Sequence, residues 1–177
     1  MKAVAFLEVR HMVEVLIEDF GYDELGKHVK KPLDGIKIAG YVGCQTNRPF
    51  GIDGESFENP KYLDKLVETM GAEPVDNYDK KVSCCGGALA FSEPEKSQAL
   101  IKDIIEAAYD GGADMIVTPC PVCQMNVEVY QDQINAQVQD QIQDAGGVLF
   151  HSDIGGLWQE CQAGRSGWAG DYREATQ

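Results

Sequence analysis

The chain has 177 residues, enough for one domain with a short appendage, and 44% of them are hydrophobic, which is ordinary for a globular core. Its formal net charge of −14 argues against partners such as nucleic acids and anionic membranes, which bind basic faces. No apolar run reaches the length that spans a bilayer, so we expect no membrane span. The chain starts like a signal peptide, but Glu8 and Arg10 interrupt the apolar stretch, so we expect a cytoplasmic protein.

The first predicted elements are mostly helical. Apolar residues at helical spacing predict a helix over residues 4–20, and His11 lies on its apolar side, where we expect it to pack. A short helix over residues 23–31 follows. Residues 37–42 then predict a strand that leads into Cys44.

The middle of the chain predicts a loop, a helix and a turn. Glycine, proline and asparagine make residues 45–58 a loop. A helix begins at Asn59-Pro60 and ends at Gly71, and a short extended piece follows it. That piece leads to a predicted turn over residues 84–87, which contains two cysteines and two glycines.

The last third of the chain alternates helices with short strands. The pattern predicts a helix over residues 94–110, a buried strand over 114–118 and a helix that begins at Pro121 and is broken by Gly146-Gly147. A strand over residues 148–150 and a short helix around 154–161 complete the series. This alternation predicts an α/β fold with a mostly parallel sheet flanked by helices.

Three segments are expected along the chain. Residues 1–35 form an N-terminal helical segment, residues 36–163 form the domain that holds the cysteines, and residues 164–177 form a polar, glycine-rich tail that we expect to be loosely ordered. The cysteines fall at predicted strand ends or in the loops after them. Open α/β sheets usually build their sites there.

Five cysteines form the most informative pattern, and they are Cys44, Cys84, Cys85, Cys120 and Cys123. In a reducing compartment such a pattern indicates metal or redox chemistry rather than structural disulfides. A structural zinc ion takes four ligands, and so does an ordinary iron–sulfur cubane. A fifth thiolate therefore favours a cluster with a bridging ligand or a non-standard core.

The Cys-Pro-Val-Cys motif at residues 120–123 follows a strand and begins a helix, where free backbone amides favour thiolate over thiol. By itself it fits a zinc knuckle, a dithiol redox centre or a cluster. A thioredoxin-like dithiol leaves the other three cysteines unexplained, and zinc leaves one over. Adjacent Cys84 and Cys85 strain a single tetrahedral ion but reach different irons of one cluster easily, so we favour iron and sulfide.

Other residues carry weaker hypotheses. Gly86 and Gly87 are expected to allow positive φ and close backbone approach to the bound group. Arg48 could meet an anionic substrate group or the charge of a cluster, or form a loop salt bridge. His151 could deliver a proton, although a capping or surface role is the more common one. Cys161 stands outside the pattern and is expected to be an ordinary thiol.

The chain resembles the cysteine-rich CCG domain family, and more narrowly the second such domain in the B-type subunit of heterodisulfide reductase. The resemblance covers about residues 8–130 and joins all five cysteines to flanking residues in the family's order. The matching motifs are Gly43-Cys44-Gln45, Arg48-Pro49, Asn59-Pro60, Gly71-Ala72-Glu73, Cys84-Cys85-Gly86-Gly87, Gly112-Ala113-Asp114 and Cys120-Pro121-Val122-Cys123-Gln124-Met125-Asn126.

The resemblance implies a function. In this family the cysteines hold a noncubane [4Fe-4S] cluster at which a disulfide is bound and split. The implied ligands are Cys44, Cys84, Cys85, Cys120 and Cys123, and the implied activity is that of an oxidoreductase acting on a sulfur group. Expected partners are the iron–sulfur and flavin subunits of a heterodisulfide reductase-like complex. The expected substrate is a small disulfide or thiol, such as the mixed disulfide of coenzymes M and B in methanogenesis.

The chain departs from the family in having one CCG domain where such subunits normally carry two. Its first residues resemble the linker between the two domains, so the chain is either a fragment, a split subunit or a single-domain member. Two alternatives to a disulfide-cleaving module therefore stay open. One is a noncatalytic subunit that only relays electrons, and the other is a zinc-binding structural domain.

Overall fold

The computed structural model describes residues 9–48, 52, 54–76, 78–131, 133–134 and 149–151. Within these residues four parallel strands form one sheet in the order β2-β1-β3-β4. The strands are β1 (Lys37–Gly40), β2 (Glu73–Pro74), β3 (Met115–Val117) and β4 (Leu149–His151). The predicted α/β class with a parallel sheet is therefore confirmed.

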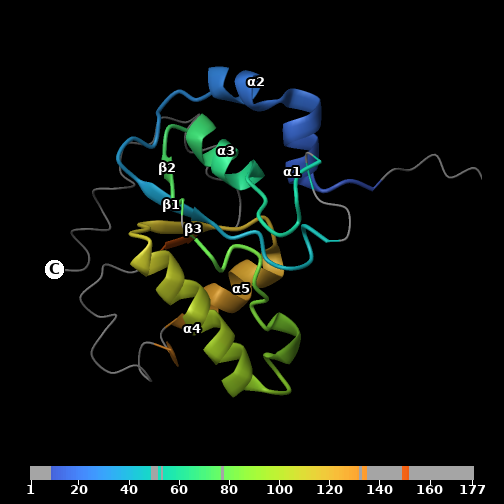
Figure 1. Ribbon diagram of the computed structural model, residues 1–177, viewed down its shortest axis with the longest axis vertical. Coiled ribbons are helices and arrows are strands. Elements are labelled where there is room, and N and C mark those ends of the chain that lie inside the picture. Colours follow the sequence, from blue (N-terminus) through green and yellow to red (C-terminus); the bar gives the residue numbers. More distant parts are fainter. Residues whose placement is uncertain are drawn as a thin grey trace, which may run out of the picture.

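Helices cover both faces of the sheet (Figure 1). One face carries the short N-terminal helices and α3, and the other carries α4 and α5. In chain order the helices are α1 (Met12–Val15), the π-helical η1 (Leu16–Phe20), α2 (Tyr22–Lys27), α3 (Tyr62–Thr69), the 3₁₀ turn η2 (Gly87–Leu89), α4 (Pro94–Asp110) and α5 (Pro121–Val129).

The two cores follow from alternation along β1, because successive side chains of a strand point to opposite faces. Ile38 and Val42 join the core beneath α1, α2 and α3. Ala39 and Tyr41 join the core beneath α4 and α5. Both cores are built on the central strands β1 and β3, which are buried on both sides except at Lys37, as is typical of parallel sheets.

The first helix begins later than the sequence pattern predicts. It starts at Met12 because His11 is its N-cap: the Val13 N–H donates to His11 Nδ1, and the His11 N–H donates to the Glu14 carboxylate. The expectation that His11 packs in the apolar face of a helix from residue 4 is therefore wrong. Residues 1–8 lie outside the described part of the chain.

Two further differences concern the ends of helices. The second helix stops at Lys27, and α5 ends at Val129, although the Ile134 N–H still donates to the Tyr130 carbonyl. The extended piece before the cysteine pair includes β2, whose Pro74 lies at the edge of the sheet, where a missing N–H is tolerated. The predicted helix at 154–161 and the tail lie outside the described residues.

Candidate metal centre

Backbone hydrogen bonds bring the three cysteine-bearing segments to the carboxyl end of the sheet. Cys44 follows β1 and Cys120 follows β3, and the two strands are neighbours. The segment before Cys84 lies at the same carboxyl end of the sheet, because the N–H groups of Val42 and Gly43 both donate to the Lys81 carbonyl, at 2.8 and 3.0 Å. Residues that are far apart in the sequence therefore share one end of the sheet, as predicted for this fold class.

The five thiols form one connected group. The sulfur atoms of Cys85 and Cys123 lie 3.6 Å apart, and Cys123 also interacts with Cys120. Cys44 interacts with Cys84 and, at longer range, with Cys85. Cys85 and Cys123 are buried, Cys44 and Cys120 are half-buried, and Cys84 is exposed. The five thiols thus form a series that extends from the interior of the protein to its surface.

Cys120 lies at the start of α5, with Pro121 in the first turn of the helix. The backbone N–H of Cys120 donates to the buried Thr118 hydroxyl at 3.4 Å. A hydrogen bond with the Cys123 thiol lowers the pKa of Cys120 to about 5, although burial opposes this. Backbone N–H groups of the first helical turn and the charge of His11 also favour the Cys120 thiolate.

Cys85 is the second thiol that the structure favours as a thiolate. Its hydrogen bond with Cys123 lowers its pKa to about 6 against the effect of burial, and the Gly87 N–H and the Asn126 amide contribute further. The contacts of Cys123 with Cys120 and Cys85 raise the pKa of Cys123. The pKa of Cys44 is raised by burial first and by Cys84 second.

Glycines allow the backbone to approach the sulfur atoms closely. A Cβ on Gly43 would lie 2.9 Å from Cys123 Sγ, and one on Gly87 would lie 3.5 Å from Cys85 Sγ. The positive φ predicted for Gly86 is confirmed, at +71°. Gly87 belongs instead to the 3₁₀ turn η2, and its small size accommodates Val122 and Cys85.

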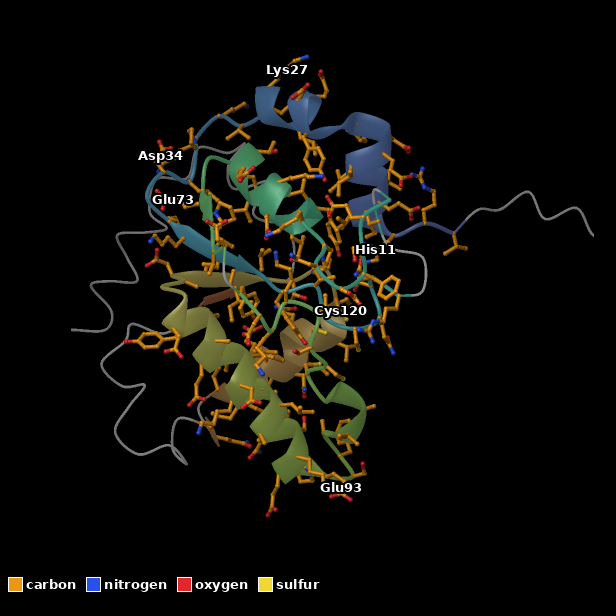
Figure 2. The ribbon with its side chains drawn as sticks, in the orientation of Figure 1. His11, Lys27, Asp34, Glu73, Glu93 and Cys120 are labelled. Atoms are coloured by element: carbon orange, nitrogen blue, oxygen red, sulfur yellow. The ribbon has the colours of Figure 1, made fainter. Side chains whose placement is uncertain are left out.

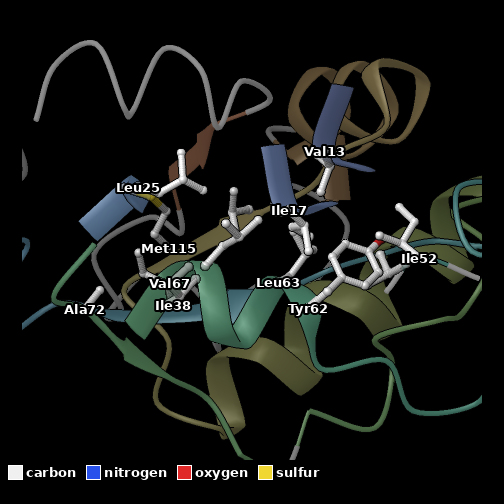
Figure 3. Close-up of a cluster of buried hydrophobic side chains, with 13 residues drawn as sticks. Val13, Ile17, Leu25, Ile38, Ile52, Tyr62, Leu63, Val67, Ala72 and Met115 are labelled. Carbon is white, nitrogen blue, oxygen red and sulfur yellow. The ribbon is translucent and has the colours of Figure 1, made fainter. Parts of the chain in front are cut away.

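The loop after Cys44 is held by apolar contacts and contains an unpaired amide. Ile52 is buried in the same cluster as Tyr62 of α3, and Figure 3 shows the two side chains close together. Asn47 is buried three residues after Cys44, and neither its amide nitrogen nor its oxygen has a hydrogen-bond partner. An unpaired buried amide is costly, and such groups often mark a place where another group binds.

Sequence reasoning missed two polar contacts that hold the cysteine loops. The Tyr41 hydroxyl donates to the Ser83 carbonyl at 2.7 Å, directly before the cysteine pair, and burial raises the pKa of Tyr41. Asn126 donates to the Cys85 carbonyl at 2.6 Å. Both partners are backbone atoms of distant segments, so no pattern in the sequence identifies them. Tyr41 lies just before Gly43 and Cys44 in the sequence, and this was the one signal that placed it near the cysteine loops.

A buried ion pair ties the segment before Cys84 to α3. Lys81 Nζ lies 2.5 Å from Asp64 Oδ2, and both side chains are buried. Lys61 Nζ lies 3.3 Å from the same oxygen, whereas Asp64 Oδ1 has no hydrogen-bond partner. Burial lowers the pKa of Lys81, and the hydrogen bond and charge of Asp64 oppose that effect.

The weaker candidates are placed as follows. Figure 2 labels His11 and Cys120 at the same side of the molecule, consistent with the effect of His11 on the Cys120 thiolate. Arg48 is exposed on the loop after Cys44. The backbone of His151 belongs to β4, but its side chain and the whole of Cys161 lie outside the described residues.

The donor set consists of five thiols and fits a sulfur-ligated metal centre. Among the described residues no three His, Cys, Asp or Glu side chains are arranged to hold one metal ion. The thiols instead meet in pairs along one group, and two of them favour the thiolate form that metals bind. Thiolates are the ligands preferred by zinc and by iron–sulfur clusters.

Comparison with known proteins agrees with this geometry. Residues 38–128 match the family of cysteine-rich (CCG) domains. The chain is 34% identical over 151 residues to the 8-methylmenaquinol:fumarate reductase membrane anchor subunit of Wolinella succinogenes, covering 85% of this chain and 51% of that protein. It is 37% identical over 133 residues to an Archaeoglobus profundus protein named as similar to the B-type subunit of heterodisulfide reductase, covering 72% and 44%.

A third relative is the B-type subunit of the ferredoxin:CoB-CoM heterodisulfide reductase of Methanosarcina mazei, 33% identical over 132 residues, or 72% of this chain and 43% of that protein. The chain spans about half the length of these curated relatives, or slightly less. No helix in the described part of the chain is long and apolar enough to cross a membrane. The resemblance to the B-type subunit of heterodisulfide reductase is confirmed, and the chain belongs to the cysteine-rich CCG domain family.

Proposed function

We propose that the chain is an iron–sulfur module of a heterodisulfide reductase-like complex and takes part in the reductive cleavage of a small disulfide. The observation that carries this proposal is the convergence of five thiols at one end of the sheet in a chain of the CCG family. The relatives named as heterodisulfide reductase subunits support the reaction class. Iron–sulfur and flavin subunits are the proposed partners.

The proposed ligands of a noncubane [4Fe-4S] cluster are Cys44, Cys84, Cys85, Cys120 and Cys123. Such a cluster would supply electrons one at a time, and its iron atoms would bind the sulfur atoms released as a disulfide is cleaved by two electrons. The protein contributes the arrangement of the thiolates: α5 and the turn after Cys85 hold the inner ligands, and the glycines bring backbone close to them.

We expect the substrate to approach from the surface side of the five thiols. Cys84 is exposed there, and the exposed Arg48 lies on the loop that follows Cys44. A guanidinium at that position would pair with an anionic group on a disulfide substrate. This assigns Arg48 a binding role and leaves the covalent chemistry to the sulfur-ligated centre.

One observation favours a second candidate, an electron-relay subunit. The relative matched over 85% of the chain is named as part of a menaquinol:fumarate reductase, a name that mentions no disulfide. In such a role the cluster would pass electrons between subunits, and the exposed thiol would face a protein partner. The two candidates share the ligands and differ in whether a small disulfide binds.

The deciding experiment is anaerobic production of the chain, reconstitution, counting of iron and sulfide, and EPR spectroscopy with and without disulfides. About four irons per chain and a spectrum that changes with a disulfide support the cleavage function. Four irons and an unchanged spectrum favour the relay. Zinc without iron would refute both and leave a structural zinc domain.

Substitution of single cysteines tests the ligand set. Cys44→Ser and Cys85→Ser should each lose iron, because each removes one of the five proposed thiolate ligands. Cys161→Ser is the matched control and should keep it. Equal iron content in all three variants would refute the ligand assignment.

A further inference from the structure

Asn126 lies on α5, three residues after Cys123, and its side chain is only 2% exposed. Its Nδ2 atom donates to the Cys85 carbonyl at 2.6 Å and to Ser97 Oγ at 3.3 Å. The two N–H groups of this buried amide thus hold the backbone of a cysteine on another segment and the hydroxyl of a serine on α4.

These contacts join three elements of the structure. Asn126 belongs to α5, Ser97 belongs to α4 and is 1% exposed, and Cys85 belongs to the turn between β2 and α4. The turn is packed tightly, since a Cβ on Gly86 would lie 3.0 Å from Ser97 Cα and 3.2 Å from Ser97 Oγ. The position of Cys85 relative to Cys123 is therefore set by α4 and α5 together, with Asn126 as the polar link.

We propose that Asn126 is a positioning residue that orients Cys85 through the Cys85 carbonyl and, with the positive end of its amide dipole next to this ligand, raises the reduction potential of the cluster bound there. The inference rests on the proposed function, and it gives a neutral residue an effect on the reduction potential of the cluster. A hydrogen-bond donor close to a cluster ligand stabilises the more negative, reduced form, and groups that support a ligand affect metal affinity. Asn126 does both from a position that solvent does not reach.

The test compares Asn126→Leu, similar in size but without a donor, with Gln124→Leu as the matched control. Gln124 lies on the same helix, but its amide donates to the Glu128 carboxylate instead. The measurements are iron per chain, loss of iron to a chelator, and the midpoint potential from an EPR-monitored titration. Asn126→Leu should lose iron at least about 10-fold faster and have a more negative potential, and Gln124→Leu should match the wild type.

Asn126→Asp provides a second variant with nearly unchanged shape, in case Asn126→Leu does not fold. Its carboxylate cannot donate a hydrogen bond and adds negative charge, so the midpoint potential should again be more negative. Ser97→Ala keeps the contact with Cys85 and should leave the potential near that of the wild type.

A wild-type potential in a folded, iron-loaded Asn126 variant overturns the inference and leaves the proposed function standing. Wild-type chain that binds no iron overturns the proposed function, and this inference with it, before any variant is made.

Discussion

The five cysteines fall into two groups with different surroundings. The inner group is Cys85, Cys120 and Cys123, held by α5 and by the turn that packs on α4. The outer group is Cys44 and Cys84, which lie on loops; Cys84 is exposed, and Cys44 is half-buried. Hydrogen bonds within the inner group lower the pKa values of Cys85 and Cys120, whereas burial and Cys84 raise that of Cys44.

This difference shows how one site combines rigidity with access. The inner thiols are oriented by backbone amides, glycines and the Asn126 amide, so their geometry is set by the fold itself. The outer thiols have fewer fixed partners; Cys84, for example, accepts a 3.4 Å hydrogen bond from the Gly86 N–H. Firm anchoring on one side and exposure on the other would suit the proposed function, in which the centre exchanges a ligand with a substrate.

The largest effect should come from removing an inner ligand. Cys123→Ser should abolish cluster binding, because Cys123 contacts both Cys85 and Cys120 and is buried where no other ligand can replace it. Cys84→Ser should keep part of the iron, since water or an added thiol can reach that exposed position. Iron and sulfide analysis after anaerobic reconstitution measures both. Equal losses would show that the two groups do not differ.

The ion pair beneath the site should have the next largest effect. Asp64→Ala leaves the buried Lys81 without its partner and should lower the free energy of unfolding by about 3–5 kcal/mol. Denaturant unfolding of the metal-free protein measures it. The double variant Asp64→Leu with Lys81→Met removes both charges and should recover most of the loss. A double variant as unstable as Asp64→Ala would show that the charges themselves are needed.

A smaller effect tests the close packing around the inner group. Gly43→Ala should cost about 1–3 kcal/mol through its positive φ, and its Cβ should also displace the Cys123 sulfur. Gly112→Ala is the matched control, because Gly112 has a similar φ of +75° and nothing within 4 Å of its would-be Cβ. Both variants should lose similar stability, but only Gly43→Ala should bind iron more weakly. Weakened iron binding in both would trace the effect to general destabilisation.

The smallest effect should appear in the pH dependence of the metal-free protein. The lowered pKa of about 5 keeps Cys120 a thiolate at pH 6–7, where an unfolded cysteine with a pKa of about 8.5 is mostly protonated. Alkylation by iodoacetamide at pH 6–7 should therefore be faster at Cys120 than in the urea-unfolded chain. The advantage should shrink as pH rises toward 9, because both forms are then ionised. Peptide mass spectrometry against time measures the rates, and equal rates at pH 6 would contradict the lowered pKa.

Much of the framework could be predicted from local pattern. The alternation of apolar runs with glycine and proline predicts the strands, α4 and the parallel sheet, and the cysteine spacing predicts which segments meet. The start of α1 was missed because a histidine side chain caps it, and histidine is an uncommon cap. Asn126, Tyr41 and the Lys81–Asp64 pair were missed because their partners come from distant segments and include backbone carbonyls. Such contacts depend on tertiary structure, which residue type and spacing do not specify.

The pairing of β1 with β3 sets the order in which the site can be assembled. Ile38 pairs with Met115, so the central pair of the sheet joins segments separated by two whole helices and the cysteine pair. Contacts between such distant segments slow folding, because a long loop must be closed before they form. A chain emerging from the ribosome therefore has Cys44 and Cys85 exposed well before Cys120 and Cys123 exist beside them. Under the proposed function, a cluster held by all five cysteines would be completed only after Cys120 and Cys123 have come beside Cys85, and the earlier thiols would have to stay reduced until then.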